Sequence, residues 1–294
     1  MSTPNPKLPA AFQFSQSNLQ DFVDCRRRFQ LRWLLRLSWP AIETEPALER
    51  EREMQRGAAF HHLLQQHILG IPAERLSAMV HDPALQTWWE NYLAFTQAPG
   101  EFAPLWQPET RRFPEIALSA PLGSHRLLAK YDLLAILPDG RVIIVDWKTS
   151  RSLTRRKYLV DRLQTRVYPH LLLQAGGQLY GGPILPEQVE MVYWFAGYPD
   201  QPERFPYSPK AHRADQEYLD SLVNLIQRLE GDDFSLTQDE TRCRYCIYRS
   251  LCDRGVKAGD LTDMETEPEL AEALELDFEQ ISEVAYDMGA ATLD

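Results

Sequence analysis

The amino-acid sequence predicts an α/β fold in which a core of strands is flanked by helices and carries further helices around it. Two apolar runs, 127–137 and 141–147, flank the Pro-Asp-Gly turn at 138–140, and Asp-Gly between apolar runs is a strong hairpin signal. The β-branched residues 142–145 are too few for a helix and are followed by charged residues, so we expect a buried strand there. This hairpin is the stretch around which the chain is organised.

Helices are expected to dominate the chain before the hairpin. Residues 1–14 are expected to form a flexible lead, after which Ser15 or Ser17 can cap a helix that ends at Pro40. The other elements expected before the hairpin are a helix over 47–69, helices and loops over 71–110, and a strand over 111–120 that carries Glu115.

The chain after the hairpin is expected to continue with helices and one more strand. A polar, basic loop leads to a helix over 161–174, in which Pro169 predicts a kink or a local break. We expect one main domain, residues 15–258, between the lead and an acidic tail. The remaining elements are a strand over 188–195, an amphipathic helix over 211–230 and an acidic helix or tail over 259–294.

The formal net charge of −11 is concentrated at one end of the 294 residues. Residues 259–294 contain twelve acids and no lysine or arginine, which leaves a nearly neutral body with 31 basic and 30 acidic residues. No apolar run approaches the ~20 residues that span a bilayer. The first residues lack the charged and apolar regions of a signal peptide. We therefore expect a cytoplasmic protein that has no membrane segment.

Two acids interrupt the apolar pattern of the hairpin. Asp132 lies in the first run, Asp146 in the second, and Lys148 follows Asp146 at the next-but-one position. Side chains at i and i+2 of a strand project from one face, so Asp146 and Lys148 point together, and Asp132 can join them from the neighbouring strand. Two carboxylates and an ammonium at one sheet edge can hold a divalent metal beside a scissile phosphate. An ordinary surface ion pair is the alternative.

Basic residues cluster just after this candidate site. Such a cluster is well placed to hold a phosphate backbone, although a run of charges is more often a solvated face. The residues of the cluster are Arg151, Arg155, Arg156, Lys157, Arg162 and Arg166.

The four cysteines have the spacing of a metal site. Cys243, Cys246 and Cys252 form a C-x2-C-x5-C pattern, and Cys25 is the one cysteine left to complete a set of four. In an intracellular protein this pattern indicates a metal or cluster rather than disulfides. Zinc and an iron–sulfur cluster both accept four thiolates, so both stay open. Either would join the first helix to the C-terminal region.

Taken together, these motifs resemble the RecB/AddB-type, iron–sulfur branch of the PD-(D/E)XK nuclease superfamily, which also includes CRISPR-associated exonucleases. Two positions depart from the family pattern: Arg26 stands where the family often has proline, and Ala129 where its strand has glycine. The matching motifs are Ser15-x-Ser17-x-Leu19 leading to Cys25, Gly57-x-x-x-His61-x-x-Leu64, Asp132, Asp146-Trp147-Lys148, Gln164-x-x-x-Tyr168 and the three late cysteines.

The resemblance implies a restriction-endonuclease-like core, a mixed central sheet flanked by helices, and it assigns roles to its residues. It implies that His61, Asp132, Asp146 and the Trp147 carbonyl bind Mg²⁺ or Mn²⁺. It further implies that Lys148 activates the attacking water and that Gln164 and Tyr168 position the lysine, the metal site or DNA. The basic cluster would contact DNA, and the cysteines would hold a 4Fe–4S cluster, with zinc as the alternative.

The function implied is a metal-dependent exonuclease that hydrolyses single-stranded DNA ends in repair or recombination. The sequence contains no Walker A glycine loop, so a motor would come from a helicase partner; a CRISPR adaptation protein is the other partner implied. Two other classes of protein stay open. One is a non-catalytic, metal-stapled nucleic-acid-binding module or partner-dependent subunit. The other is an electron carrier, which would leave His61, Asp132, Asp146 and Lys148 without a role.

Overall fold

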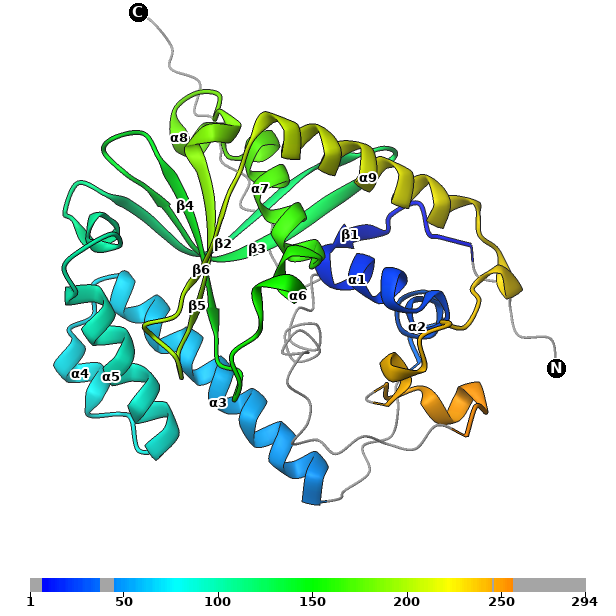
Figure 1. Ribbon diagram of the computed structural model, residues 1–294, viewed down its shortest axis with the longest axis horizontal. Helices are drawn as coiled ribbons and strands as arrows, with labels where there is room; N and C mark the ends of the chain where they lie inside the picture. The colour runs from blue at the N-terminus through cyan, green and yellow to red at the C-terminus, as the bar shows by residue number, and fades with distance from the viewer. Residues whose placement is uncertain (1–6, 38–44, 245, 256–294) are drawn as a thin grey trace, which may run out of the picture.

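The computed structural model describes residues 7–37, 45–244 and 246–255, and its centre is a six-stranded mixed sheet. Strand order is β1-β3-β4-β5-β6, and β2 pairs with β3. The β3–β4 and β5–β6 pairs are antiparallel, whereas the β4–β5 and β1–β3 pairs are parallel. This confirms the predicted mixed sheet flanked by helices (Figure 1). The strands are β1 (Gln13–Ser15), β2 (Arg111–Leu122), β3 (His125–Ile136), β4 (Val142–Lys148), β5 (Val189–Phe195) and β6 (Glu203–Pro206).

The predicted hairpin is present as β3 and β4. Its turn is closed by a hydrogen bond from the Leu137 N–H to the Arg141 carbonyl (2.9 Å), and Gly140 takes a left-handed φ of 86° that other residues adopt at a cost. Every residue of β4 is buried, which explains why its sequence is a continuous apolar run before Asp146.

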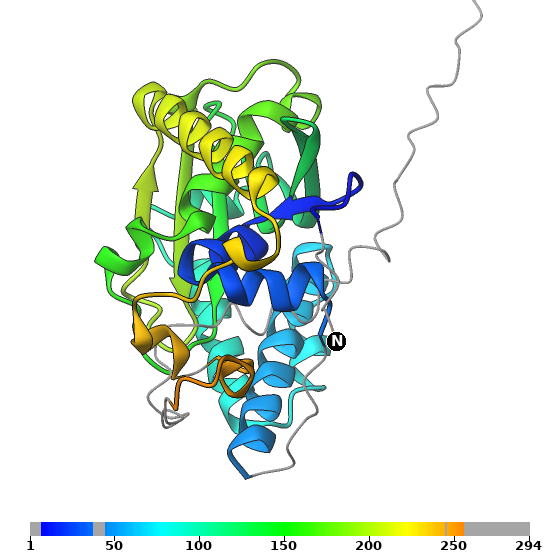
Figure 2. The same ribbon diagram turned by 90° about the vertical axis from the view of Figure 1, so that its right-hand side faces the viewer.

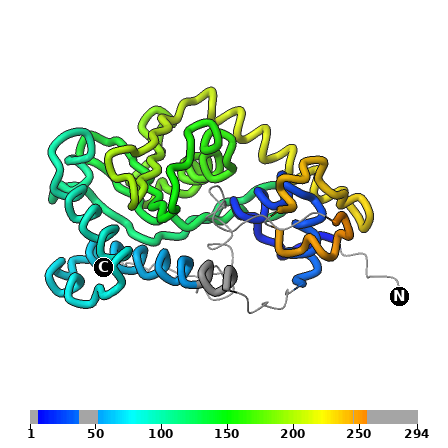
Figure 3. Tube along the Cα trace, turned by 60° about the horizontal axis from the view of Figure 1, so that its bottom comes forward, coloured from blue at the N-terminus to red at the C-terminus, as the bar shows by residue number. Residues whose placement is uncertain are grey.

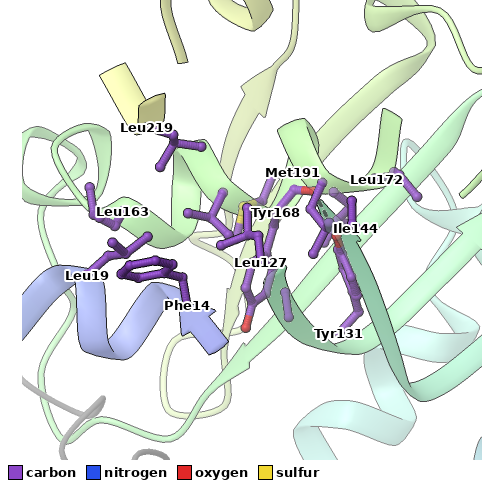
Figure 4. Packing of buried hydrophobic residues seen from close by; sticks show 14 of the residues in the cluster. Phe14, Leu19, Leu127, Tyr131, Ile144, Leu163, Tyr168, Leu172, Met191 and Leu219 are labelled. Carbon is purple, nitrogen blue, oxygen red and sulfur yellow. Dashed lines mark hydrogen bonds between the residues drawn. The ribbon is translucent and has the colours of Figure 1, made fainter. Parts of the chain in front are cut away.

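Two layers of helices cover the two faces of the sheet (Figure 1). Val142 and Ile144 of β4 face a core built with α7 and α9, part of which Figure 4 shows, while Ile143 and Val145 face a core built with α3, α4 and α5. The helices of the second layer are α3 (Glu45–Ile68), α4 (Ala73–Ser77) and α5 (Pro83–Gln97). The first layer contains α1 (Gln16–Asp24), α6 (Arg156–Val160), α7 (Leu163–Ala175), α8 (Gly177–Tyr180) and α9 (Pro209–Arg228).

The first predicted helix is broken at Cys25. The chain forms α1, then Cys25 in an extended conformation (φ −163°, ψ 110°), then α2 (Arg26–Phe29) and a π-helical turn, Gln30–Leu34. The break separates the Cys25 side chain from the helical repeat and lets α2 begin in a new direction. The predicted end at Pro40 lies outside the described residues. The flexible lead was predicted to reach residue 14, but Gln13 and Phe14 pair with β3 in β1.

Two details after the hairpin differ from the prediction. The basic loop contains the short helix α6, and α7 continues through Pro169 instead of breaking there. Pro169 is buried, and α7 packs along β2, β3, β5 and α9, so tertiary packing holds the helix together despite the missing N–H group.

The N-terminal helices and the C-terminal segment lie side by side in all three overall views (Figures 1–3). The Arg27 N–H donates to the Ser235 carbonyl (3.1 Å), the Gln30 side chain donates to the Gly231 carbonyl (2.9 Å), and the Tyr248 hydroxyl donates to the Leu37 carbonyl (2.9 Å). The predicted acidic tail lies outside the described residues. Among the described helices, none combines the length and apolarity needed to cross a membrane.

Candidate active site

The charged end of β4 is buried rather than exposed. Asp146 is 1% exposed and Lys148 is 4% exposed, although the residues are ionisable. Both continue the row of Val142 and Ile144 and face α7. The Lys148 Nζ lies 2.9 Å from Asp146 Oδ2, so the two opposite charges compensate each other. The interpretation of Asp146 and Lys148 as a surface ion pair is therefore wrong for this structure.

Gln164, in the first turn of α7, joins these two residues. Its amide Nε2 donates to Asp146 Oδ1, and its carbonyl Oε1 accepts from Lys148 Nζ at 3.1 Å. The ring of Tyr193 lies beneath the ammonium, with 5.5 Å between Nζ and the ring centre. The lysine is thus held in one place by a carboxylate, an amide and an aromatic face. We call Asp146, Lys148 and Gln164 the buried triad.

Tyr168, one turn after Gln164, lies in the core between α7 and the sheet. Its ring centre is 4.9 Å from that of Tyr131, and its backbone carbonyl accepts from the Tyr131 hydroxyl at 2.9 Å (Figure 4). These contacts fix the position of α7 on β3. A role of Tyr168 in positioning the lysine, the metal or DNA stays a prediction.

Strands β3 and β4 separate beside the buried triad. Their ladder ends at the pair Leu133–Val145, and beyond it the Trp147 N–H donates to the carboxylate of Asp132 (2.8 Å). The Trp147 carbonyl lies 3.0 Å from His61 Nε2 on α3. His61, Asp132 and the Trp147 carbonyl therefore meet where the two strands diverge.

The surrounding core fixes this opening. The Trp147 indole packs against Tyr92, Phe95 and Trp194, with ring centres 5.6–6.3 Å apart, so the backbone at Trp147 cannot move freely. Gly57 lets α3 approach the chain after β4, because a β-carbon there would lie 3.1 Å from the Thr149 hydroxyl. The predicted aromatic cover over 71–110 thus supports the site without entering it.

Glu115 of β2 belongs to the same cluster and was given no role by the sequence. The register pairs Pro114 with Leu133 and Ile116 with Tyr131, so Glu115 stands opposite Asp132. One donor atom from each of His61, Glu115 and Asp132 lies within 4.8 Å of the others. Glu115 has a left-handed φ of 54°, a conformation that non-glycine residues rarely adopt and that is concentrated at functional sites. The one feature of the sequence that could have indicated this role is the position of an acidic residue, Glu115, inside a predicted strand.

The electrostatics of this cluster favour a positive charge. Burial lowers the pKa of His61, but the attraction and hydrogen bonding of Asp132 and Glu115 outweigh burial and hold that pKa well above its ordinary value. Burial raises the pKa of Asp132, yet His61 and the Trp147 N–H bring it below its ordinary value. Carboxylates, an imidazole and a carbonyl are ligands of Mg²⁺ and Mn²⁺, and His61 Nδ1 lies 3.5 Å from Asp132 and 3.8 Å from Glu115. The residues present fit such an ion.

The predicted ligand set is only partly assembled. The structure brings His61, Asp132 and the Trp147 carbonyl together with Glu115, and among the described residues Asp146 is not a member of this close group. Asp146 instead forms the buried triad with Lys148 and Gln164. We call His61, Glu115, Asp132 and the Trp147 carbonyl the cation cluster. It is adjacent to the buried triad, since Trp147 lies between Asp146 and Lys148 in β4.

Comparison with known protein families identifies the superfamily of the chain. The model of the PD-(D/E)XK nuclease superfamily matches residues 13–253, which include both groups of side chains. The chain belongs to the PD-(D/E)XK nuclease superfamily. Asp146-Trp147-Lys148, at the end of β4, lies within the matched residues and has the spacing of the D-x-K part of the superfamily pattern. No curated protein matches the chain.

Two solved structures show a distant similarity to this chain. SSO0001 is 15% identical with a TM-score of 0.38, over 83% of this chain and 87% of the other. A candidate exonuclease from Eubacterium rectale is 12% identical with a TM-score of 0.45, over 83% of this chain and 89% of the other.

The basic residues that follow β4 differ in how far their charge is compensated by acids of the chain. Arg151 pairs with Glu53 (2.6 Å), Arg156 with Glu203 (2.6 Å) and Arg166 with Asp215 (3.0 Å), so part of their charge is compensated within the chain. Arg155 and Lys157 are exposed, and Arg162 is partly exposed. The Lys157 ammonium lies 4.8 Å from the ring centre of the exposed Tyr158.

The four cysteines of the nuclease chain line one cavity between the N-terminal helices and the C-terminal segment. Arg28 and Tyr248 also line it. Burial, with a smaller contribution from the neighbouring thiols of Cys25 and Cys252, raises the pKa of Cys246 to about 11. Thiolates in this cavity therefore need a compensating cation. The residues fit a metal or cluster with four thiolate ligands.

Replacing Glu115 by glutamine tests the cation cluster. Removing one negative charge while keeping the side-chain shape is expected to weaken Mn²⁺ binding by about 10- to 100-fold, the range typical of groups that support a metal site. Titration calorimetry with Mn²⁺ measures the affinity. Glu187→Gln, an exposed residue outside the site, is the matched control and should bind as the wild type does. Wild-type affinity in Glu115→Gln would remove Glu115 from the metal site.

Proposed function

We propose that this nuclease is a metal-dependent DNA exonuclease that acts on single-stranded ends during repair or recombination. The observation that carries the proposal is the buried triad, with Lys148 fixed by Asp146 and Gln164, directly beside the cluster of His61, Asp132 and Glu115. Burying a lysine and an aspartate costs free energy unless both are paired and hydrogen-bonded. The burial of these two charged residues at one sheet edge, despite its cost in folding free energy, supports a role for them in catalysis.

The side chains divide the work of phosphodiester hydrolysis. His61, Asp132, Glu115 and the Trp147 carbonyl would hold Mg²⁺ or Mn²⁺, which when bound polarises the phosphoryl oxygen and lowers the pKa of its water. Lys148 orients the attacking water and offsets the charge that develops on the phosphate. Asp146 compensates the charge of Lys148, and the family resemblance implies that it also binds the metal. Gln164 fixes the directions of both.

The DNA contact is proposed to centre on α6. Arg155 and Lys157 would hold phosphates, and Tyr158, 47% exposed, would stack on an unpaired base. α6 is close to the triad: the Leu159 carbonyl accepts from the Thr165 hydroxyl, which lies 2.7 Å from the Tyr193 hydroxyl beneath Lys148. A stacking surface beside the site favours single strands, in which bases are accessible. Arg151, Arg156, Arg162 and Arg166 would line the approach.

A 4Fe–4S cluster in the cysteine cavity, the mark of the RecB/AddB-type branch, is proposed in preference to zinc. Around one tetrahedral ion with bonds of about 2.3 Å, sulfurs lie about 3.8 Å apart. Within the described part of the chain, no three cysteine sulfurs lie within 4.8 Å of one another. This wider spacing favours a group larger than one ion.

The biological setting is proposed from the sequence. A cytoplasmic enzyme of this kind would work with a helicase, or with a CRISPR adaptation protein, that supplies the unwound end. Co-purification of the tagged chain tests both partners; recovery of neither class would argue against an obligate complex.

Replacing Asp146 by asparagine tests the nuclease proposal. The loss of charge beside Lys148 is expected to slow cleavage by at least about a hundredfold, the scale of removing a positioned acid–base group. Linear single-stranded DNA labelled at either end, circular single-stranded DNA and blunt duplex are compared with Mn²⁺. Cleavage of the linear single strand alone would support an exonuclease.

Asp139→Asn, in the exposed turn at the other end of the hairpin, is the matched control and should leave cleavage unchanged. Wild-type protein that binds Mn²⁺ and cleaves none of these substrates would favour the non-catalytic binding module or a partner-dependent subunit.

The α6 contact is tested by Tyr158→Ala. Losing one base-stacking contact is expected to raise the KM for single-stranded DNA at least about fivefold with little change in kcat, since stacking contributes about 1–3 kcal/mol per base. Tyr158→Phe should retain the wild-type KM. Val160→Ala, an equally exposed residue on the same helix, is the matched control. An unchanged KM in Tyr158→Ala would place the DNA elsewhere.

Elemental analysis of anaerobically purified protein tests the cysteine site. About four irons and four sulfides per chain are expected, and Cys246→Ser should lose most of them. Tyr248→Phe, which changes the cavity wall without removing a thiol, should retain them. A result of one zinc per chain without iron would show that the cysteines bind zinc instead of an iron–sulfur cluster.

A further inference from the structure

The helix that carries Gln164 lacks a cap of its own. Arg162 precedes α7 without a side-chain hydrogen bond to the first turn, yet the first four N–H groups of any helix need partners from outside it. The Leu163 N–H donates to the side-chain Oε1 of Gln20, on α1, at 3.0 Å. Gln20 thus caps α7 from a helix more than a hundred residues earlier in the chain.

The other end of the Gln20 amide points to the cysteine region. Gln20 Nε2 donates to Asp24 Oδ1 at 3.0 Å, and Asp24 directly precedes Cys25. Asp24 is buried and pairs with Arg28 (2.7 Å) and Arg242 (3.2 Å), and both arginines line the cysteine cavity. The position of the Gln20 amide is therefore set at the wall of that cavity.

We propose that Gln20 is a positioning residue that ties the wall of the cysteine cavity to the active site. The connection runs from Asp24 through Gln20 to the Leu163 N–H, and the next residue, Gln164, holds Asp146 and Lys148. α1 packs directly against α7, so the connection crosses one helix–helix contact (Figure 1). Loss of the cap lets the first turn of α7 fray, and the triad loses its alignment.

The chain contains a close match to Gln20 at the far end of α7. Gln216, on α9, donates to Asp220 four residues on (2.8 Å) and accepts from Gln174 of α7 (3.0 Å). Gln20 likewise donates to an aspartate four residues on and accepts from α7. Gln216→Ala therefore removes the same kind of bond to an aspartate and a side-chain, rather than backbone, bond to the same helix, away from Gln164.

The activity readout, which rests on the proposed function, is kcat against KM on single-stranded DNA. Gln20→Ala is expected to lower kcat about 10- to 100-fold, as removal of supporting groups does, with KM unchanged because Gln20 lies outside the DNA-contact residues. Gln20→Glu keeps an oxygen acceptor at the helix N-terminus, where negative charge is favourable, but it loses the bond to Asp24 and should recover only part of kcat. Gln216→Ala should behave as the wild type does.

A second readout is independent of catalysis. Amide hydrogen exchange at Leu163 should become about two- to tenfold faster in Gln20→Ala, because its N–H loses its hydrogen bond to Gln20. Unchanged exchange at Leu163, or an equal loss of kcat in Gln216→Ala, would overturn the inference. If the wild type shows no cleavage, the proposed function fails while the exchange still decides the role of Gln20.

Discussion

The pairing of two buried opposite charges at the end of β4 is the constraint on which the site depends. Asp146 and Lys148 lie almost fully inside the protein, and an unpaired charge there would cost several kcal/mol. Each therefore needs the other, and the remaining hydrogen-bonding capacity needs a third group, which Gln164 provides. The sheet alone cannot meet this need, so α7 has to lie on the end of β4. The same helix, α7, therefore covers this face of the sheet and completes the hydrogen bonding of the buried pair.

The cation cluster follows from an irregularity in β3. Tyr131 and Leu134 both face the α7 side of the sheet, while Leu133 faces the α3 side, so the alternation of faces shifts by one residue at Asp132. The shift directs the Asp132 carboxylate toward His61 and the Trp147 N–H. The left-handed backbone of Glu115 brings a second carboxylate to the same place. The buried triad and the cation cluster thus adjoin one another at Trp147 of β4, whose backbone N–H and carbonyl contact Asp132 and His61.

The sequence predicts what depends on local pattern. The hairpin follows from the β-branched run and the Asp-Gly turn, and the common cavity of the cysteines agrees with their spacing. Strict alternation along a strand predicted that Asp132 can join Asp146 and Lys148. A one-residue shift at Asp132 also turns its carboxylate toward His61 and the Trp147 N–H, which the alternation did not predict. Glu115 was missed because its role depends on a backbone conformation that no local pattern specifies. The break at Cys25 was missed because apolar periodicity continues across it.

The contact of Gln20 with α7 joins residues far apart in the sequence, so no local pattern could predict it. It also links the N-terminal helices to the candidate active site. α7 must present Gln164 at its first turn, which is the part of a helix that frays most readily. The Arg162 side chain does not cap α7, and the Leu163 N–H donates to Gln20 instead, so the first turn depends on α1. α1 is in turn fixed by Asp24, whose buried charge is paired with Arg28 beside it and with Arg242 from the C-terminal segment. Joining the two ends of the chain at the cysteine cavity therefore stabilises the one helix turn on which the buried triad depends.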